Sequence, residues 1–161
     1  MAIQSNTDEL LYLASQFRAA IEKAKRAGEF ESDNVFREFP YGCCGDTCDL
    51  LATYLIENDY TPYYVCGTYR GGSFEQKQSH AWLTVGNKII DITGDQFKFD
   101  PLLYYFDKPV YSGNAGRFHK AFEVDERFEH KGIEYLDDYS QARLFGIYAR
   151  IMQYIPDINA E

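Results

Sequence analysis

The residues best suited to chemistry are a cysteine, a histidine and an aspartate that follow one another along the chain. Cys44 lies in the segment GCCGD (42–46), and His80 and Asp91 lie in two short apolar segments that come later. A thiol becomes a strong nucleophile when it ionises, and the first turn of a helix and a neighbouring imidazolium both favour ionisation. A histidine can act as the base if a third group orients its ring. We therefore expect Cys44, His80 and Asp91 to form a nucleophilic site.

The four cysteines leave alternatives open, because three of them lie within six residues. The chain begins without the pattern of a signal peptide, so we expect free thiols and not disulfides. Zinc bound by Cys44, Cys48 and His80 is an alternative, disfavoured because a CxxC pair is absent. Cys48 and Cys66 are expected to pack in the core, and Cys43 is the rival nucleophile if the motif is shifted by one residue.

The elements that must position these residues start with an amphipathic helix expected over 7–27. Its apolar residues recur every three or four positions, Asn6 marks its start and Gly28 its end. A loop is expected over 31–42 and a second helix over 46–58, with Asp46 in the first turn and Cys44 at the start.

Three short strands are expected at 62–69, 80–85 and 88–93, because these segments are rich in β-branched and aromatic residues. Gly86-Asn87 is typical of a two-residue hairpin between the last two. In that register position 82 faces Asp91, and His80 lies one diagonal step from Asp91 on the same face. We expect Trp82 to pack on the opposite face from His80.

The remainder of the chain is expected to contain a loop-rich stretch over 101–118 with room for one strand, a short strand at 119–125 and a closing helix over 137–155 before Pro156. His119 and His130 have polar sequence neighbours. We expect both side chains to be solvated and to have no function.

Composition narrows the class of protein. The chain has 161 residues, of which 45% are hydrophobic and 17% aromatic, which predicts one domain with a substantial core. Its 16 basic and 25 acidic residues give a net charge of −9, which disfavours nucleic acid and anionic membranes and favours a neutral or basic substrate. No apolar run could span a membrane, so a cytoplasmic location is expected.

In this order, the motifs resemble those of the transglutaminase-like branch of the papain-like cysteine enzymes. The family's G-x-C-x-D is similar to residues 42–46 and is followed by a leucine-rich helix. Its next block resembles TPYYVCGTY (61–69), its His-Ala-Trp stands at 80–82, and its aspartate strand resembles IIDIT (89–93). The resemblance covers about residues 40–97. Many members have Pro-Thr after the aspartate, where this chain continues to Thr93-Gly94-Asp95-Gln96-Phe97.

The resemblance implies an α+β fold with a papain-like core, in which the nucleophile helix packs on a small antiparallel β-sheet and helices lie at both ends of the chain. It also implies Cys44 as nucleophile, His80 as general base and acid, and Asp91 as the carboxylate that orients His80. Tyr41 and Gln96 are candidates for oxyanion or substrate contacts. Neither a metal nor an organic cofactor is required.

The expected activity is acyl transfer from an amide bond of a protein, a peptide or a small amide. Water as acceptor gives a peptidase or amidase, a glutamine donor gives a deamidase, and an amine acceptor gives a transglutaminase. The small size and the lack of a calcium-loop motif favour a hydrolase or deamidase. The alternatives are a bacterial effector or toxin with transglutaminase activity, and a catalytically silent binding module on the same scaffold.

Overall fold

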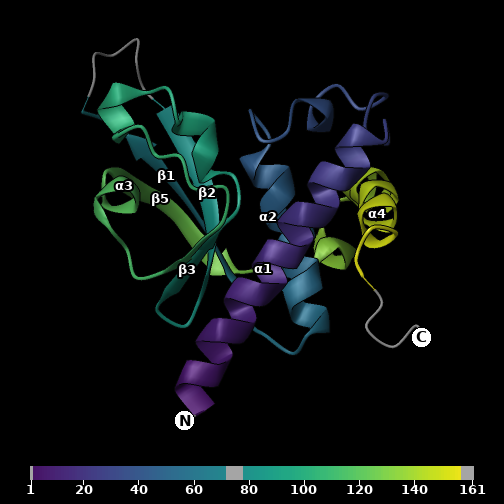
Figure 1. The fold of residues 1–161 in the computed structure, drawn as a ribbon, viewed down its shortest axis with the longest axis horizontal. Coiled ribbons are helices and arrows are strands. Elements are labelled where there is room, and N and C mark those ends of the chain that lie inside the picture. The colour runs from purple at the N-terminus through teal and green to yellow at the C-terminus, as the bar shows by residue number, and fades with distance from the viewer. Residues whose placement is uncertain (1, 72–77, 157–161) are drawn as a thin grey trace.

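The structure is a computed structural model that describes residues 2–71 and 78–156, with side chains from Glu9 onward (Figure 1). It has the expected α+β architecture. The helices are α1 (Ala2–Arg26), α2 (Cys44–Glu57), α3 (Arg117–Lys120) and α4 (Asp138–Met152). The strands are β1 (Tyr63–Tyr69), β2 (Gln78–Val85), β3 (Lys88–Asp91), β4 (Tyr111–Gly113) and β5 (Phe122–Glu129).

The five strands form one sheet in the order β4-β3-β2-β1-β5, and every neighbouring pair is antiparallel. The hairpin between β2 and β3 turns at Gly86-Asn87 and pairs Leu83 with Ile90, which confirms the predicted register. Gly86 has a φ of 60°, a conformation that glycine adopts at little cost. This register determines which side chains of β2 and β3 share a face.

The two faces of the sheet carry different cores. Helices α1, α2 and α4 gather on one side of the sheet in Figure 1. There the buried side chains of Phe17, Ile21 and Leu51 meet Leu83 and Ile90 of the sheet. The other face carries a smaller cluster, formed mainly by aromatic residues: Val65, Trp82, Ile89, Phe97, Leu103, Phe118 and Phe122. Both clusters border the ends of β2 and β3 that hold His80 and Asp91.

Helix α1 differs from its prediction at one end only. It begins at Ala2, so the start expected at Asn6 is wrong; residues 2–5 contain no helix breaker, and the helix extends through them. It ends where expected, because Gly28 has a φ of 81° and the amides of Gly28 and Glu29 bond to the carbonyls of Lys25 and Ala24. No helix in the described parts of the chain is long and apolar enough to span a membrane.

The start of α2 is anchored from a distant helix. Arg143 of α4 donates to both carboxylate oxygens of Asp46, at 3.0 and 2.6 Å. It also donates to both oxygens of Asp33, at 2.8 and 2.9 Å, in the loop that leads to α2. One guanidinium thus holds the loop and the first turn of the helix together, and Cys44 lies in that turn.

The C-terminal half departs most from expectation. The strand predicted at 119–125 is wrong in position: residues 117–120 form the single turn α3, and strand β5 follows at 122–129. His119 and His130 are both buried and both bond to carboxylates, so the expectation of solvated side chains is wrong. The closing helix α4 is confirmed and ends at Met152.

Candidate active site

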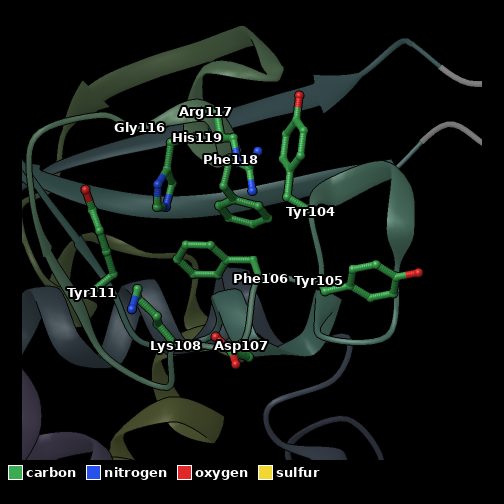
Figure 2. Close-up of a pocket in the computed structure, with 10 residues that line it drawn as sticks. All are labelled: Tyr104, Tyr105, Phe106, Asp107, Lys108, Tyr111, Gly116, Arg117, Phe118 and His119. Carbon is green, nitrogen blue, oxygen red and sulfur yellow. The ribbon is translucent and has the colours of Figure 1, made fainter.

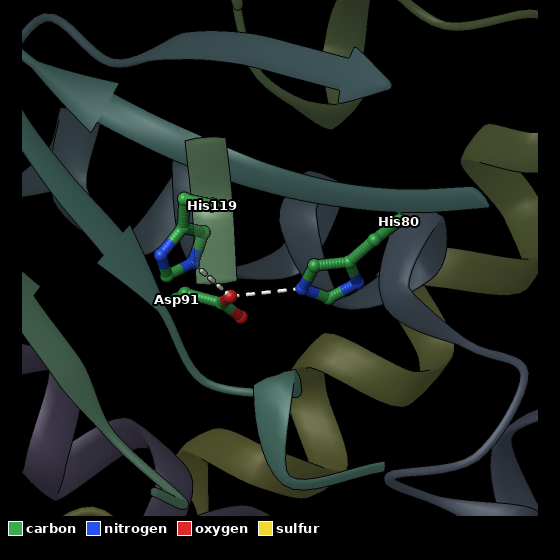
Figure 3. Close-up of side chains that lie close together, drawn as sticks. All are labelled: His80, Asp91 and His119. Atoms are coloured by element: carbon green, nitrogen blue, oxygen red, sulfur yellow. Dashed lines mark hydrogen bonds and ion pairs between the residues drawn. The ribbon is translucent and has the colours of Figure 1, made fainter. Parts of the chain in front are cut away.

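His80 and Asp91 form a buried pair at the ends of adjacent strands. Nε2 of His80 lies 2.8 Å from Oδ2 of Asp91 (Figure 3), as the diagonal hairpin relation predicts. The two residues are 0% and 2% exposed, respectively. The other carboxylate oxygen accepts a hydrogen bond from the Thr93 amide at 3.0 Å. A carboxylate only accepts, so Nε2 of His80 carries the hydrogen and Nδ1 is left for another partner.

The Cys44 thiol lies close enough to the His80 ring for each group to shift the pKa of the other. It comes from the first residue of α2, where unpaired helical amides favour a negative charge. Burial would raise the pKa of the Cys44 thiol, but the hydrogen bond and charge of His80 outweigh burial and lower it. The site therefore favours a thiolate at Cys44.

The adjacent Cys43 has the opposite environment. Its side chain is 2% exposed and belongs to the core between the helices and the sheet. Its nearest polar contact is the Thr47 hydroxyl, 3.8 Å from the sulfur. Burial raises the pKa of the Cys43 thiol to about 12, so Cys43 stays protonated and poorly nucleophilic. All four cysteines are free, as expected.

The charges of His80 and Asp91 support each other. Burial alone would lower the pKa of His80, but the Asp91 carboxylate and, to a smaller extent, Cys44 raise it to about 9. Burial would likewise raise the pKa of Asp91, yet the imidazoles of His80 and His119 hold it well below its usual range. These directions favour a Cys44 thiolate beside a His80 imidazolium that Asp91 stabilises.

The segment after Asp91 forms a 3₁₀ helix, Gly94–Phe97, which an ion pair fixes from α1. Arg18 donates to both oxygens of Asp95, at 2.9 and 2.8 Å, and to the carbonyl of Ile92 at 2.8 Å. Asp95 is thus a structural partner of Arg18 at a position where the resembled family departs from this chain. The buried bidentate ion pair between Arg18 and Asp95 holds the turn that carries Gln96.

The two candidates for oxyanion or substrate contacts separate in space. The side-chain nitrogen of Gln96 lies 3.4 Å from Nδ1 of His80 and 3.1 Å from the carbonyl of Thr93, so the fold brings Gln96 to the site. Tyr41 is 43% exposed, and no hydrogen bond of its hydroxyl to Cys44 or His80 is present in the described chain. Gln96 is the better candidate for a contact beside the nucleophile.

Trp82 lies on the same face of β2 as His80, so its expected position on the opposite face is wrong. Residues two apart in a strand point the same way. The Trp82 ring centroid is 5.6 Å from that of His80 and 5.0 Å from that of His119. Phe97 packs edge-on to His80 at 5.2 Å. These rings exclude water from the His80–Asp91 pair.

His119 is the residue that sequence reasoning missed. Its Nε2 lies 2.7 Å from Oδ2 of Asp91, the same oxygen that faces His80 (Figure 3). It also lines a cavity of about 260 Å³ together with Phe106, Lys108, Tyr111 and Arg117 (Figure 2). No local pattern marks it, because a single helical turn delivers it from a loop-rich stretch.

The zinc alternative does not match the geometry. Within the described ranges, the group whose three ligand atoms lie within 4.8 Å of one another is His80, Asp91 and His119, without Cys48. Both imidazoles lie at hydrogen-bond lengths of 2.8 and 2.7 Å from one carboxylate oxygen. We therefore interpret this group as a hydrogen-bonded network.

Comparison with known proteins found no similar protein. A scan of family models found no match, and searches of curated proteins and of solved structures found no significant match.

Proposed function

We propose that this chain is a thiol-dependent acyl-transfer enzyme that acts on amide bonds, with a papain-like core of the transglutaminase-like kind. Cys44 is the nucleophile, His80 the general base and acid, and Asp91 the group that orients His80. The observation that carries the proposal is the buried His80–Asp91 pair, with 2.8 Å between Nε2 and Oδ2, on strands beside the helix that begins at Cys44. The pKa directions agree with it: His80 lowers the pKa of Cys44, whereas burial raises that of Cys43.

The core assignment is supported by the way the elements meet. A helix that begins at the cysteine packs against a β-strand that carries the histidine, and the aspartate lies on the next antiparallel strand. The motifs at 42–46, 80–82 and 89–93 occupy these elements in the order of the resembled family.

The reaction proceeds in two steps. The Cys44 sulfur attacks the amide carbonyl carbon, the carbon–nitrogen bond breaks, and the proton on Nδ1 of His80 passes to the departing nitrogen. This leaves a thioester on Cys44 and a neutral His80. Water or an amine then attacks the thioester carbon and gives its proton to His80. The carbon–sulfur bond breaks, which regenerates the Cys44 thiolate and releases an acid or a new amide.

The oxyanion of each step needs hydrogen-bond donors close to Cys44. The backbone amides at the start of α2 meet this need, because the first four amides of a helix have no intrahelical partner. The side-chain amide of Gln96 lies beside His80 and is a second donor. Asp91 remains ionised throughout and stabilises the imidazolium of His80.

The substrate is a protein or peptide, or a small amide, and the acidic chain favours a neutral or basic one. Glutamine side chains are a candidate donor, which makes deamidation and amine transfer part of the same proposal. We expect the enzyme to act in the cytoplasm without a metal or organic cofactor.

The test is a screen of peptide amides and glutamine-containing peptides, with and without an amine acceptor, read by mass spectrometry. The proposal predicts a product and a thioester adduct on Cys44 that Cys44→Ala does not form, whereas Cys43→Ala retains both. The control Cys48→Ala removes a buried thiol outside the triad and should retain activity. Equal turnover by Cys44→Ala and the wild type would refute the assignment, and a reactive Cys44 with no turnover would favour the silent binding module.

A further inference from the structure

We propose that His119 is a positioning residue of this site, whose ring N–H holds the Asp91 carboxylate in the orientation that His80 needs. The inference rests on the proposed function, because it assigns His119 to the same catalytic group. His119 does not touch the nucleophile; it acts through Asp91.

One carboxylate oxygen is shared by two imidazoles. Oδ2 of Asp91 lies between them, 2.8 Å from Nε2 of His80 and 2.7 Å from Nε2 of His119 (Figure 3). A carboxylate has no hydrogen to donate when ionised, so both Nε2 atoms must donate. The two donors approach from β2 and from α3, and Thr93 holds the other oxygen. Three donors therefore restrain the carboxylate from rotating.

Burial makes these donors necessary. Asp91 is 2% exposed and His119 is 3% exposed, so little water is available to solvate the carboxylate. An ionised carboxylate shielded from water is stable only when its lone pairs accept hydrogen bonds from the protein. The described residues supply three donors, and His119 is one of the two on the oxygen that faces His80.

The His119 ring is itself held in place by aromatic neighbours. Ring centroids of Phe118, Trp82 and Tyr111 lie 4.8, 5.0 and 5.1 Å from its own. Phe106 packs edge-on at 5.6 Å. Such packing on several sides restricts the rotamers of the imidazole, as preorganisation of a supporting group requires.

The chain contains a matched control for a merely structural histidine. His130 is as buried as His119, and its Nε2 lies 2.7 Å from Oδ1 of Asp49. Its Nδ1 accepts a hydrogen bond from the Gly132 amide at 2.9 Å, so the ring links α2 to the segment that follows β5. Loss of His130 should affect stability as loss of His119 does, without touching the Asp91 carboxylate.

The experiment compares His119→Leu, His119→Gln and His130→Leu in the full chain. The measurements are the iodoacetamide rate constant of Cys44 near neutral pH and the proton NMR signal of the His80 Nε2–H. In His119→Leu we expect alkylation to slow about tenfold, as loss of one hydrogen bond to a charged group implies. We also expect the His80 proton to exchange faster with water.

The conservative variant provides the rescue. The side-chain amide nitrogen that His119→Gln introduces can take the place of Nε2, so this variant should stay close to the wild type in both measurements. Leucine packs better than glutamine among aromatic rings, so a role in packing alone predicts the reverse order. If His119→Leu fails to fold, His119→Asn replaces it, because its shorter side chain falls short of Asp91.

The outcomes separate this inference from the proposed function. Alkylation and proton exchange in His119→Leu that equal those of the wild type, with Asp91→Asn altered, would overturn the role of His119 alone. Equal losses in His119→Leu and His130→Leu would also overturn it. An unreactive Cys44 in the wild type would instead overturn the proposed function.

Discussion

Replacing Asp91 by asparagine removes the charge on which His80 depends while it keeps the shape of the side chain. His80 is 0% exposed, so burial alone would lower its pKa, and the Asp91 carboxylate instead raises it to about 9. The net difference from the ordinary value of 6.5, to which Asp91 contributes more than Cys44, corresponds to about 3 kcal/mol in favour of the imidazolium. In Asp91→Asn this stabilisation is lost, and so is the thiolate that the imidazolium supports.

The assay is the rate of Cys44 alkylation by iodoacetamide as a function of pH. Near neutral pH we expect the rate constant of Asp91→Asn to fall about a hundredfold, since about 3 kcal/mol corresponds to about two powers of ten. At higher pH the rate should rise as the thiol ionises unaided. Asp49→Asn is the control, because it removes the carboxylate that bonds to His130. Identical pH profiles for Asp91→Asn and the wild type would show that Asp91 does not control the charge of His80.

Three further changes test the surroundings of the site. In Cys44→Ala the free energy of unfolding, measured by urea unfolding, should fall as the pH rises above about 6.5, because Asp91 still raises the pKa of His80 and the folded protein keeps a proton that the unfolded chain loses. In the wild type the Cys44 thiolate binds one proton fewer and offsets this slope, so equal slopes would contradict the ion pair. In Gly94→Ala the new Cβ would lie 2.6 Å from the Phe106 ring and 3.2 Å from Asp91. We therefore expect the free energy of unfolding to fall by about 1–3 kcal/mol and the alkylation of Cys44 to slow. The control Gly146→Ala, where the new Cβ meets no atom within 4 Å, should lose no stability. Arg143→Met should cost about 2–3 kcal/mol in urea unfolding, because Asp33 and Asp46 lose the guanidinium that both of them bind. A wild-type unfolding midpoint would contradict that role.

The geometry of His80 and Asp91 could be predicted from the sequence because strands obey a strict alternation. Once Gly86-Asn87 sets the turn, every pair of the hairpin follows, and the observed pairing of Leu83 with Ile90 is the predicted one. The same alternation places Trp82 beside His80. The expectation that Trp82 faces away from His80 contradicts this alternation and is wrong.

The partners that complete the site could not be predicted in this way, because they depend on contacts between distant segments. His119 meets Asp91 from a single helical turn without periodicity. Arg18 meets Asp95 from the middle of α1, where its sequence neighbours indicate only a helix. Polar residues beside His119 in sequence predicted solvent, whereas the fold covers its ring with aromatic side chains.

The proposed chemistry depends above all on Cys44, and not its neighbour Cys43, being the activated thiol. The most direct measurement is site-resolved alkylation of the folded wild type at mildly acidic pH, where an ordinary thiol is almost fully protonated. We expect Cys44 to be modified faster than an ordinary thiol, because His80 lowers its pKa, and we expect no modification of Cys43, whose pKa burial raises to about 12. Labelling that persists in Cys44→Ala and disappears in Cys43→Ala would contradict this assignment.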